Sequence, residues 1–186
     1  MRKLLVLLAV ASAFVAGCGS DDDPTLDATG AEGAHNDADV AFAQGMIPHH
    51  QQAIEMADLA STQAQRAEVK GLARRIKEAQ QPEIDQMQGW LSEWGEEGDA
   101  GHDGGHDGDD SMGMMSEEDM ARLEQASGAE FDRLFLDGMI RHHEGAVKMA
   151  ETELAGGEHA AAKELAQRII DSQRAEIAEM RGLLAG

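Results

Sequence analysis

The same segment occurs twice in this chain. Shifting the sequence by 93 residues aligns residues 39–91 with residues 132–184 without a gap, and 22 of the 53 aligned positions are identical. Two copies are too few for a solenoid, which needs at least about three repeats to bury a continuous core. The chain is therefore predicted to be a duplicated domain.

Each copy predicts two helices, because its apolar and histidine positions recur at spacings of three and four. In the first copy the two stripes are Phe42, Met46, His49, His50, Ala53, Met56 and Ala57, and Leu72, Ile76, Gln80, Glu83, Met87 and Leu91. Turns are expected near residues 61–66 and 155–159. Two hairpins that bury these stripes against each other make an all-α four-helix bundle, with a long crossover linker between the copies.

Composition excludes several classes of function. The 186 residues include 36 acidic and 15 basic side chains, which gives a formal net charge of −21. Nucleic-acid binding is not expected, because the phosphate backbone is bound by clustered Lys and Arg. The single cysteine excludes both an internal disulfide framework and a cysteine-rich zinc site.

The first residues indicate export. Residues 1–17 have a charged start and an apolar run of about a dozen residues, typical of a signal peptide. The run ends in Val-Ala-Gly-Cys at positions 15–18, which resembles the bacterial lipoprotein cleavage box and implies a lipid on Cys18. An ordinary secretory signal with an incidental cysteine is the alternative. We expect an exported protein, lipid-anchored to the outer face of the cell membrane or facing the periplasm.

Two stretches contain almost nothing apolar to bury. Residues 18–37 are expected to form a disordered tether, and residues 95–116 to hold no fold. The domain therefore spans residues 38–186. It consists of a first repeat (39–94), a linker rich in His, Met, Asp and Gly (95–127) and a second repeat (128–186).

Polar side chains recur on the buried stripes. An antiparallel hairpin that turns near residue 64 or 65 places position 49 level with 80 and position 46 level with 83. Burying imidazole, amide and carboxylate groups costs several kcal/mol unless they are paired or bind a metal. A His–Glu or His–Gln pair across each hairpin would satisfy these groups without a metal. Because the set is repeated in both copies, we favour metal binding.

The residue types indicate which metal. Imidazole suits Cu, Zn, Fe and Ni, whereas thioether sulfur selects soft Cu(I) and, by the same chemistry, Ag(I). Glu83 and Glu176 are direct ligands or acceptors that orient a histidine. The candidate ligand set is Met46, His49, His50, Glu83, Met87, Met139, His142, His143, Glu176 and Met180.

A weaker, secondary metal-binding role is considered for a further set of His and Met residues. His-rich short tracts are compositional metal binders, although a solvated acidic linker is an equally good interpretation. Met56 and Met149 are equally well explained as core residues. The secondary set is Met56, Met149, His102, His106, Met112, Met114 and Met115.

Two segments carry a family resemblance: Gly-Met-Ile-Pro-His-His-Gln-Gln-Ala-Ile-Glu-Met-Ala at 45–57 and Gly-Met-Ile-Arg-His-His-Glu-Gly-Ala-Val-Lys-Met-Ala at 138–150. With the Gln-x2-Glu-Ile-x2-Met motif at 80–87 and its twin, the chain resembles domain of unknown function 305 over about residues 37–186. The resemblance implies a ferritin-like four-helix fold, export or lipid anchoring, and binding chiefly of copper.

Ferritin-like ancestry suggests a rival function, a di-iron carboxylate oxidase. Such a site needs Glu-x-x-His motifs on two helices. None of the four histidines on the predicted helix stripes belongs to such a motif, because Met46, Ile47, Met139 and Ile140 stand three residues before them. A metal-free helical module that binds a partner protein through its acidic surface is a third possibility. We expect no enzyme activity and no organic cofactor, and the sequence names no protein partner.

Overall fold

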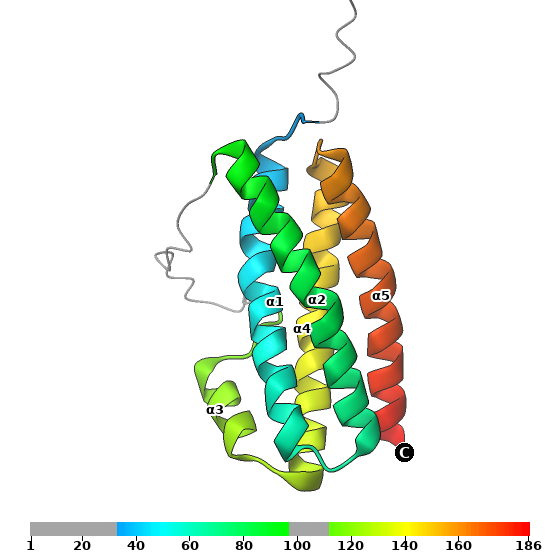
Figure 1. The fold of residues 1–186 in the computed structure, drawn as a ribbon. Helices are drawn as coiled ribbons and strands as arrows, with labels where there is room; N and C mark the ends of the chain where they lie inside the picture. Colours follow the sequence, from blue (N-terminus) through cyan, green and yellow to red (C-terminus); the bar gives the residue numbers. More distant parts are fainter. Residues whose placement is uncertain (1–32, 97–111) are drawn as a thin grey trace, which may run out of the picture.

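Five helices form the described part of the chain in the computed structural model, which covers residues 33–96 and 112–186 (Figure 1). They are α1 (Asp37–Gln63), α2 (Ala67–Trp94), α3 (Glu117–Gln125), α4 (Gly128–Gly156) and α5 (Ala160–Ala185). The predicted all-α fold is confirmed. The signal peptide, Cys18, most of the tether, His102 and His106 lie outside the described residues.

The four long helices pack as two hairpins. α1 packs along α2, α4 packs along α5, and α1 and α4 join the two hairpins. An ion pair of 2.6 Å between Arg75 and Glu179 links α2 to α5. The end of α2 and the start of α4 lie at opposite ends of the bundle, so the connection between the hairpins crosses its length, as predicted (Figure 1).

Two aspartates close the turns of the hairpins. Asp39, near the start of α1, accepts hydrogen bonds from the backbone N–H groups of Glu158 and His159 at the start of α5. Asp132, near the start of α4, accepts from Gln65 and Arg66 at the start of α2. The first N–H groups of a helix have no partner within it, so each carboxylate satisfies donors of the other hairpin.

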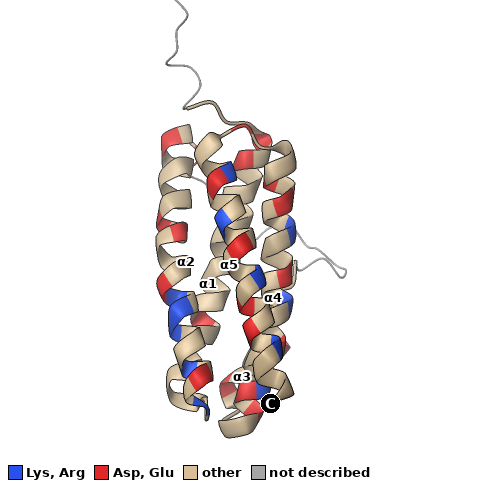
Figure 2. Ribbon diagram, turned by 90° about the vertical axis from the view of Figure 1, so that its right-hand side faces the viewer, with Lys and Arg blue, Asp and Glu red and all other residues tan. Residues whose placement is uncertain are grey.

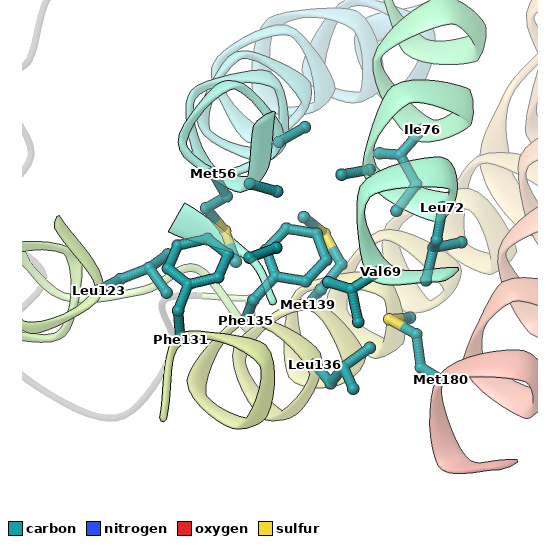
Figure 3. Packing of buried hydrophobic residues seen from close by; sticks show 14 of the residues in the cluster. Met56, Val69, Leu72, Ile76, Leu123, Phe131, Phe135, Leu136, Met139 and Met180 are labelled. Atoms are coloured by element: carbon teal, nitrogen blue, oxygen red, sulfur yellow. The ribbon is translucent and has the colours of Figure 1, made fainter. Parts of the chain in front are cut away.

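The apolar core is divided into two clusters, one on either side of the buried histidines. Along α1, Phe42 and Met46 belong to one cluster and Ala53 and Met56 to the other, with the histidines between them. Figure 3 shows the cluster nearer the turn between α1 and α2, which contains Val69, Leu72, Ile76, Leu123, Phe131, Phe135, Leu136, Met139 and Met180.

Charged residues are distributed along the helices of the bundle (Figure 2). They form exposed ion pairs within and between helices, such as Lys77 with Asp58 and Arg174 with Glu151. Among the described helices, none is apolar over a stretch long enough to cross a membrane.

The described end of the linker differs from the expectation that residues 95–116 hold no fold. Residues Met112–Met115, which we call the strap, lie against α1 and α4, and Ser116 caps α3 by accepting a hydrogen bond from the N–H of Asp119. Leu123 of α3 is fully buried in the core. The segment is ordered by backbone hydrogen bonds and by two buried side chains, those of Met115 and Leu123.

Candidate metal centre

Four buried histidines occupy the middle of the bundle. His49 and His50 come from α1, and His142 and His143 come from α4. Each pair consists of adjacent residues because both members must face inward across a broad buried stripe. All four side chains are almost completely shielded from solvent.

Each hairpin contains the same histidine–glutamate contact. His50 Nε2 lies 2.7 Å from Glu83 Oε2, and His143 Nε2 lies 2.7 Å from Glu176 Oε2. Both glutamate side chains are 19% exposed, so the carboxylates reach from the layer toward solvent. A carboxylate accepts, so the Nε2–H of each histidine donates, and in the neutral imidazole Nδ1 then carries the lone pair.

The two hairpins meet at His49 and His142. Their ring centroids are 3.7 Å apart and the ring planes are inclined by 44°. His49 Nε2 is 2.9 Å from the carbonyl oxygen of Met112 in the strap. A carbonyl accepts only, so here too Nε2–H donates and Nδ1 keeps the lone pair.

The buried layer is short of hydrogen-bond partners. In the described residues, eleven buried side-chain nitrogen and oxygen atoms have no partner, and eight of them belong to this layer. Buried polar atoms are normally paired, so a concentration of unpaired atoms at one level of the bundle requires an explanation. The eight are the Nδ1 atoms of His49, His50, His142 and His143, Nε2 of His142, both amide atoms of Gln80, and Oε1 of Gln173.

Burial also keeps two of the imidazoles neutral. Desolvation lowers the pKa of His49 to about 4. The hydrogen bond to the Met112 carbonyl raises this pKa, whereas repulsion from His50 and His143 lowers it further. Desolvation, with repulsion from the neighbouring histidines, holds the pKa of His142 well below its usual value. A neutral imidazole has a free lone pair, which is the form that binds a metal.

The candidate methionines lie in the apolar clusters beside the layer. Met46 and Met87 are buried together in one cluster, and Met139 and Met180 in the other. Met46 is one helical turn from His49 and His50, so its side chain lies on the same face of α1. Each apolar cluster therefore brings two thioethers to one side of the histidine layer.

No group of three or more His, Cys, Asp or Glu side chains within residues 33–96 and 112–186 is arranged to hold a metal ion. The structure brings together His50 with Glu83, His143 with Glu176, and His49 with His142.

The secondary methionines divide between core and strap. Met56 is fully buried, and Met149 packs against the other apolar cluster. Met115 is buried in the core with its sulfur against Gly138, whereas the side chain of Met112 is 39% exposed. Met114 lies between them in the strap.

Three residues near the layer or the ends of the bundle have roles that the sequence did not predict. Gln52 holds the strap through hydrogen bonds to Met115, and Gly145 gives the strap room. Gln52 and Gly145 occupy the same aligned position of the repeat, and the difference between these two residues was the only sign in the sequence of their separate roles. Glu153 is buried beside Asp39, at a position where the first copy has Ala60.

A family model described as domain of unknown function (DUF305) matches residues 39–184. The chain belongs to this family. No match occurs among the curated proteins.

Solved structures of DUF305 proteins share the fold. A putative secreted DUF305 protein from Streptomyces coelicolor is 31% identical with a TM-score of 0.71, covering 80% of this chain and 92% of its own. A DUF305 fragment from Deinococcus radiodurans is 34% identical with a TM-score of 0.72, covering 81% and 97%.

CopM is a third relative, solved in several metal-bound forms. Its Cu(II)-bound form is 37% identical with a TM-score of 0.68, and its Cu(I)-bound form is 34% identical with a TM-score of 0.65. Each covers 78% of this chain and 94% of CopM. CopM has also been solved in an Ag-bound form.

Proposed function

We propose that this DUF305 protein is an extracytoplasmic metal-binding protein that sequesters or relays Cu(I), and by the same chemistry Ag(I). The observation that carries the proposal is the buried layer in which eight polar atoms have no partner, flanked on both sides by thioethers. A layer that only supported the fold would pair these atoms or replace them with apolar groups.

Three of the four histidines have the arrangement that metal ligands need. The Nε2–H groups of His50 and His143 donate to glutamates, and that of His49 donates to a backbone carbonyl. Metal-ligating histidines almost always donate their second ring N–H to such an acceptor, which fixes the tautomer and the ring orientation. In this proposal the Nδ1 atoms are the donors to the metal, and the glutamates orient their histidines.

Sulfur sets the choice of metal. Thioether ligands favour Cu(I) over the harder divalent ions, and Met46, Met87, Met139 and Met180 lie beside the layer. A dry site of imidazole and thioether groups holds Cu(I) away from solvent and from redox cycling. The role is therefore binding rather than catalysis.

The relatives support the chemistry and the location. CopM, at 34–37% identity, binds Cu(I), Cu(II) and Ag in its solved forms. The Streptomyces relative is described as a putative secreted protein, in line with the signal peptide expected at residues 1–17. Our proposal places this chain in the cell envelope, held by a lipid on Cys18, with copper homeostasis or tolerance as its role.

A competition titration tests the proposal. The protein without residues 1–17 is titrated with Cu(I) in the presence of a chelator of known affinity, beside a double variant with His49→Ala and His50→Ala. We expect tight binding by the parent protein and its loss in the variant. A control with His35→Ala, a histidine stacked on Trp94 away from the layer, should bind as the parent does.

Two results would favour the other functions. Oxygen consumption on addition of Fe(II) would support a di-iron oxidase. A fully helical protein that takes up neither Cu(I) nor Ag(I) would support a metal-free interaction module.

A further inference from the structure

The strap is built against the histidine layer by contacts on both of its sides. On the α1 side, the backbone N–H of Met115 donates to Gln52 Oε1 at 2.7 Å, and Gln52 Nε2 donates to the Met115 carbonyl at 2.9 Å. The Met115 side chain is buried in the core with its sulfur against Gly138. A backbone segment clamped through both its N–H and its C=O has a fixed position.

On the α4 side the strap depends on a glycine. A Cβ added at Gly145 would lie 1.5 Å from the carbonyl oxygen of Met112, a separation that no side chain tolerates. A Cβ at Gly113 would lie 2.1 Å from the carbonyl oxygen of Arg141. The strap backbone therefore touches the backbone of α4 directly.

The strap adopts an uncommon backbone conformation at the point where it meets His49. Met112 has a φ of 47° and Gly113 a φ of 81°, both in the left-handed region. A non-glycine residue persists there only when its surroundings determine the conformation. Here the conformation aims the Met112 carbonyl at His49 Nε2, 2.9 Å away.

The two copies of the repeat differ where the strap docks. Gln52 and Gly145 occupy the same aligned position of the repeat. Gln52 forms hydrogen bonds to the strap, whereas Gly145, which has no side chain, leaves space for its backbone. The strap consequently serves only one of the two central histidines. Both ring nitrogens of His142, the twin of His49, lack a partner among the described residues.

We propose that the strap is part of the metal site, with the Met112 carbonyl as the positioning group for His49. This inference rests on the proposed function. The carbonyl does for His49 what Glu83 and Glu176 do for His50 and His143: it holds the proton on Nε2 and presents the Nδ1 lone pair to a soft monovalent cation. The two hairpins are therefore unequal, because only His49 of the two central histidines has such a positioning group.

Two variants disrupt the docking of the strap, one on α4 and one on α1, without changing a histidine. Gly145→Ala places a methyl group where the Met112 carbonyl lies, and Gln52→Ala removes the hydrogen bonds to Met115. Matched controls are Gly89→Ala, whose added methyl meets nothing within 4 Å, and Gln51→Ala, at the exposed position next to Gln52.

The first measurement is Cu(I) affinity by chelator competition. Loss of an outer hydrogen-bond partner of a metal ligand costs about 10- to 100-fold in affinity, so both strap variants should weaken Cu(I) binding by that factor while the controls do not. If the strap were instead a lid that blocks the site, removing it would leave the affinity unchanged or raise it, and either result would overturn the proposal.

The second measurement separates positioning from a merely structural role. Nitrogen-15 NMR of the metal-free protein reports the tautomer of each histidine. His49 should carry its proton on Nε2 in the parent and lose that preference in both strap variants, while His50 and His143 keep theirs. An unchanged His49 tautomer in the variants would overturn the proposal whatever the affinity.

The outcomes also separate this inference from the proposed function. If the parent protein takes up no Cu(I), both fail together. If the parent binds Cu(I) and the strap variants bind it equally well, only the role of the strap is refuted. Circular dichroism checks that each variant is folded, and if Gly145→Ala is not, Gln52→Ala alone decides.

Discussion

The imidazole ring of His49 packs against the ring of His142, with centroids 3.7 Å apart, between the two central helices of the bundle. Neither ring is charged at neutral pH, because burial holds both pKa values far below the usual range. A folded protein keeps such a pair of largely unpaired polar groups at a cost in stability, and this cost can be measured.

Replacing His142 by Leu should stabilise the metal-free protein. Both ring nitrogens of His142 are buried without a partner, and relieving such desolvation is worth about 1–3 kcal/mol. Urea denaturation of the metal-free variant should show a higher midpoint, while Cu(I) affinity falls. His143→Leu is the contrasting control, because it breaks the hydrogen bond to Glu176 and should lower the midpoint. A destabilised His142→Leu protein would mean that His142 supports the fold.

Glu83→Gln should weaken metal binding without unfolding the protein. The amide still accepts from His50 Nε2, but without the charge that makes the native hydrogen bond strong. Chelator competition should show an affinity for Cu(I) lower by about 10- to 100-fold. Glu78→Gln, which only alters an exposed ion pair with Arg74, serves as the control. Equal affinities in the two variants would exclude an orienting role for Glu83.

Replacing Met46 and Met87 together by Leu should change the choice of metal more than the stability. Volume-conserving swaps between Met and Leu in a core cost less than about 1.5 kcal/mol each. With the sulfurs gone, affinity for Cu(I) and Ag(I) should fall well below that of the parent, while binding of Zn(II) through imidazole changes little. The matched control is Met120→Leu, which replaces a partly buried methionine of α3. Unchanged Ag(I) binding would remove these thioethers from the site.

Asp132→Ala should destabilise the bundle by about 1–3 kcal/mol, because backbone N–H groups at the start of α2 lose their acceptor. Its carboxylate accepts from the N–H groups of both Gln65 and Arg66, and no other group replaces it there. The control is Asp137→Ala, at an exposed ion pair with Arg133 that is expected to contribute within about 0.5 kcal/mol. Thermal or urea denaturation distinguishes the two, and equal losses would show that Asp132 does not cap α2.

Glu153 should make the stability depend on pH. Burial, with the neighbouring Asp39, raises the pKa of Glu153 to about 8 from 4.5. The folded state therefore holds a proton that the unfolded state releases, so this contribution is complete below about pH 4.5 and is lost as pH rises through about 8. Burial also raises the pKa of Asp39, but hydrogen bonds from the backbone of Asn36, Glu158 and His159 outweigh it and lower the pKa overall. The contribution of Asp39 is accordingly lost at the acidic end.

Urea midpoints at about pH 6 and pH 9 test this dependence. The parent should be less stable at the higher pH, and Glu153→Gln should lose much of that difference. Glu151→Gln, an exposed residue paired with Arg174, should behave as the parent does. A parent protein equally stable at both values would refute the raised pKa.

The hairpins were predictable from sequence, but the side chains that touch across each hairpin differ by one helical turn from the pairs that the sequence predicted. Counting from the turn placed position 46 level with Glu83, whereas the structure pairs Glu83 with His50. Side chains in a helix tilt toward its N-terminus. In an antiparallel hairpin the side chains of the two helices therefore tilt in opposite directions along the axis. A residue of the first helix touches a partner whose backbone is level with a position about one turn earlier in that helix. The tilt shifts both hairpins equally and leaves the identity of the candidate site unchanged.

The strap was not predictable by the same reasoning. Residues 112–115 are too short a segment to show a helix or strand period, and their order comes from backbone hydrogen bonds to Gln52 and from the space at Gly145. Such contacts leave no periodic pattern. The roles of Asp39 and Asp132 were also hidden, although both are identical in the repeat, because the donors that they satisfy lie in the other hairpin.

The reciprocal hydrogen bonds of Asp39 and Asp132 suggest how the two halves of the chain came to depend on each other. Each hairpin carries an aspartate whose carboxylate accepts from the two backbone N–H groups just before the second helix of the other hairpin. This is the contact that two separate, identical hairpins would make on pairing. A gene encoding one hairpin alone would thus already specify a symmetric homodimer, and fusing two such genes would keep every reciprocal contact while freeing each half to diverge.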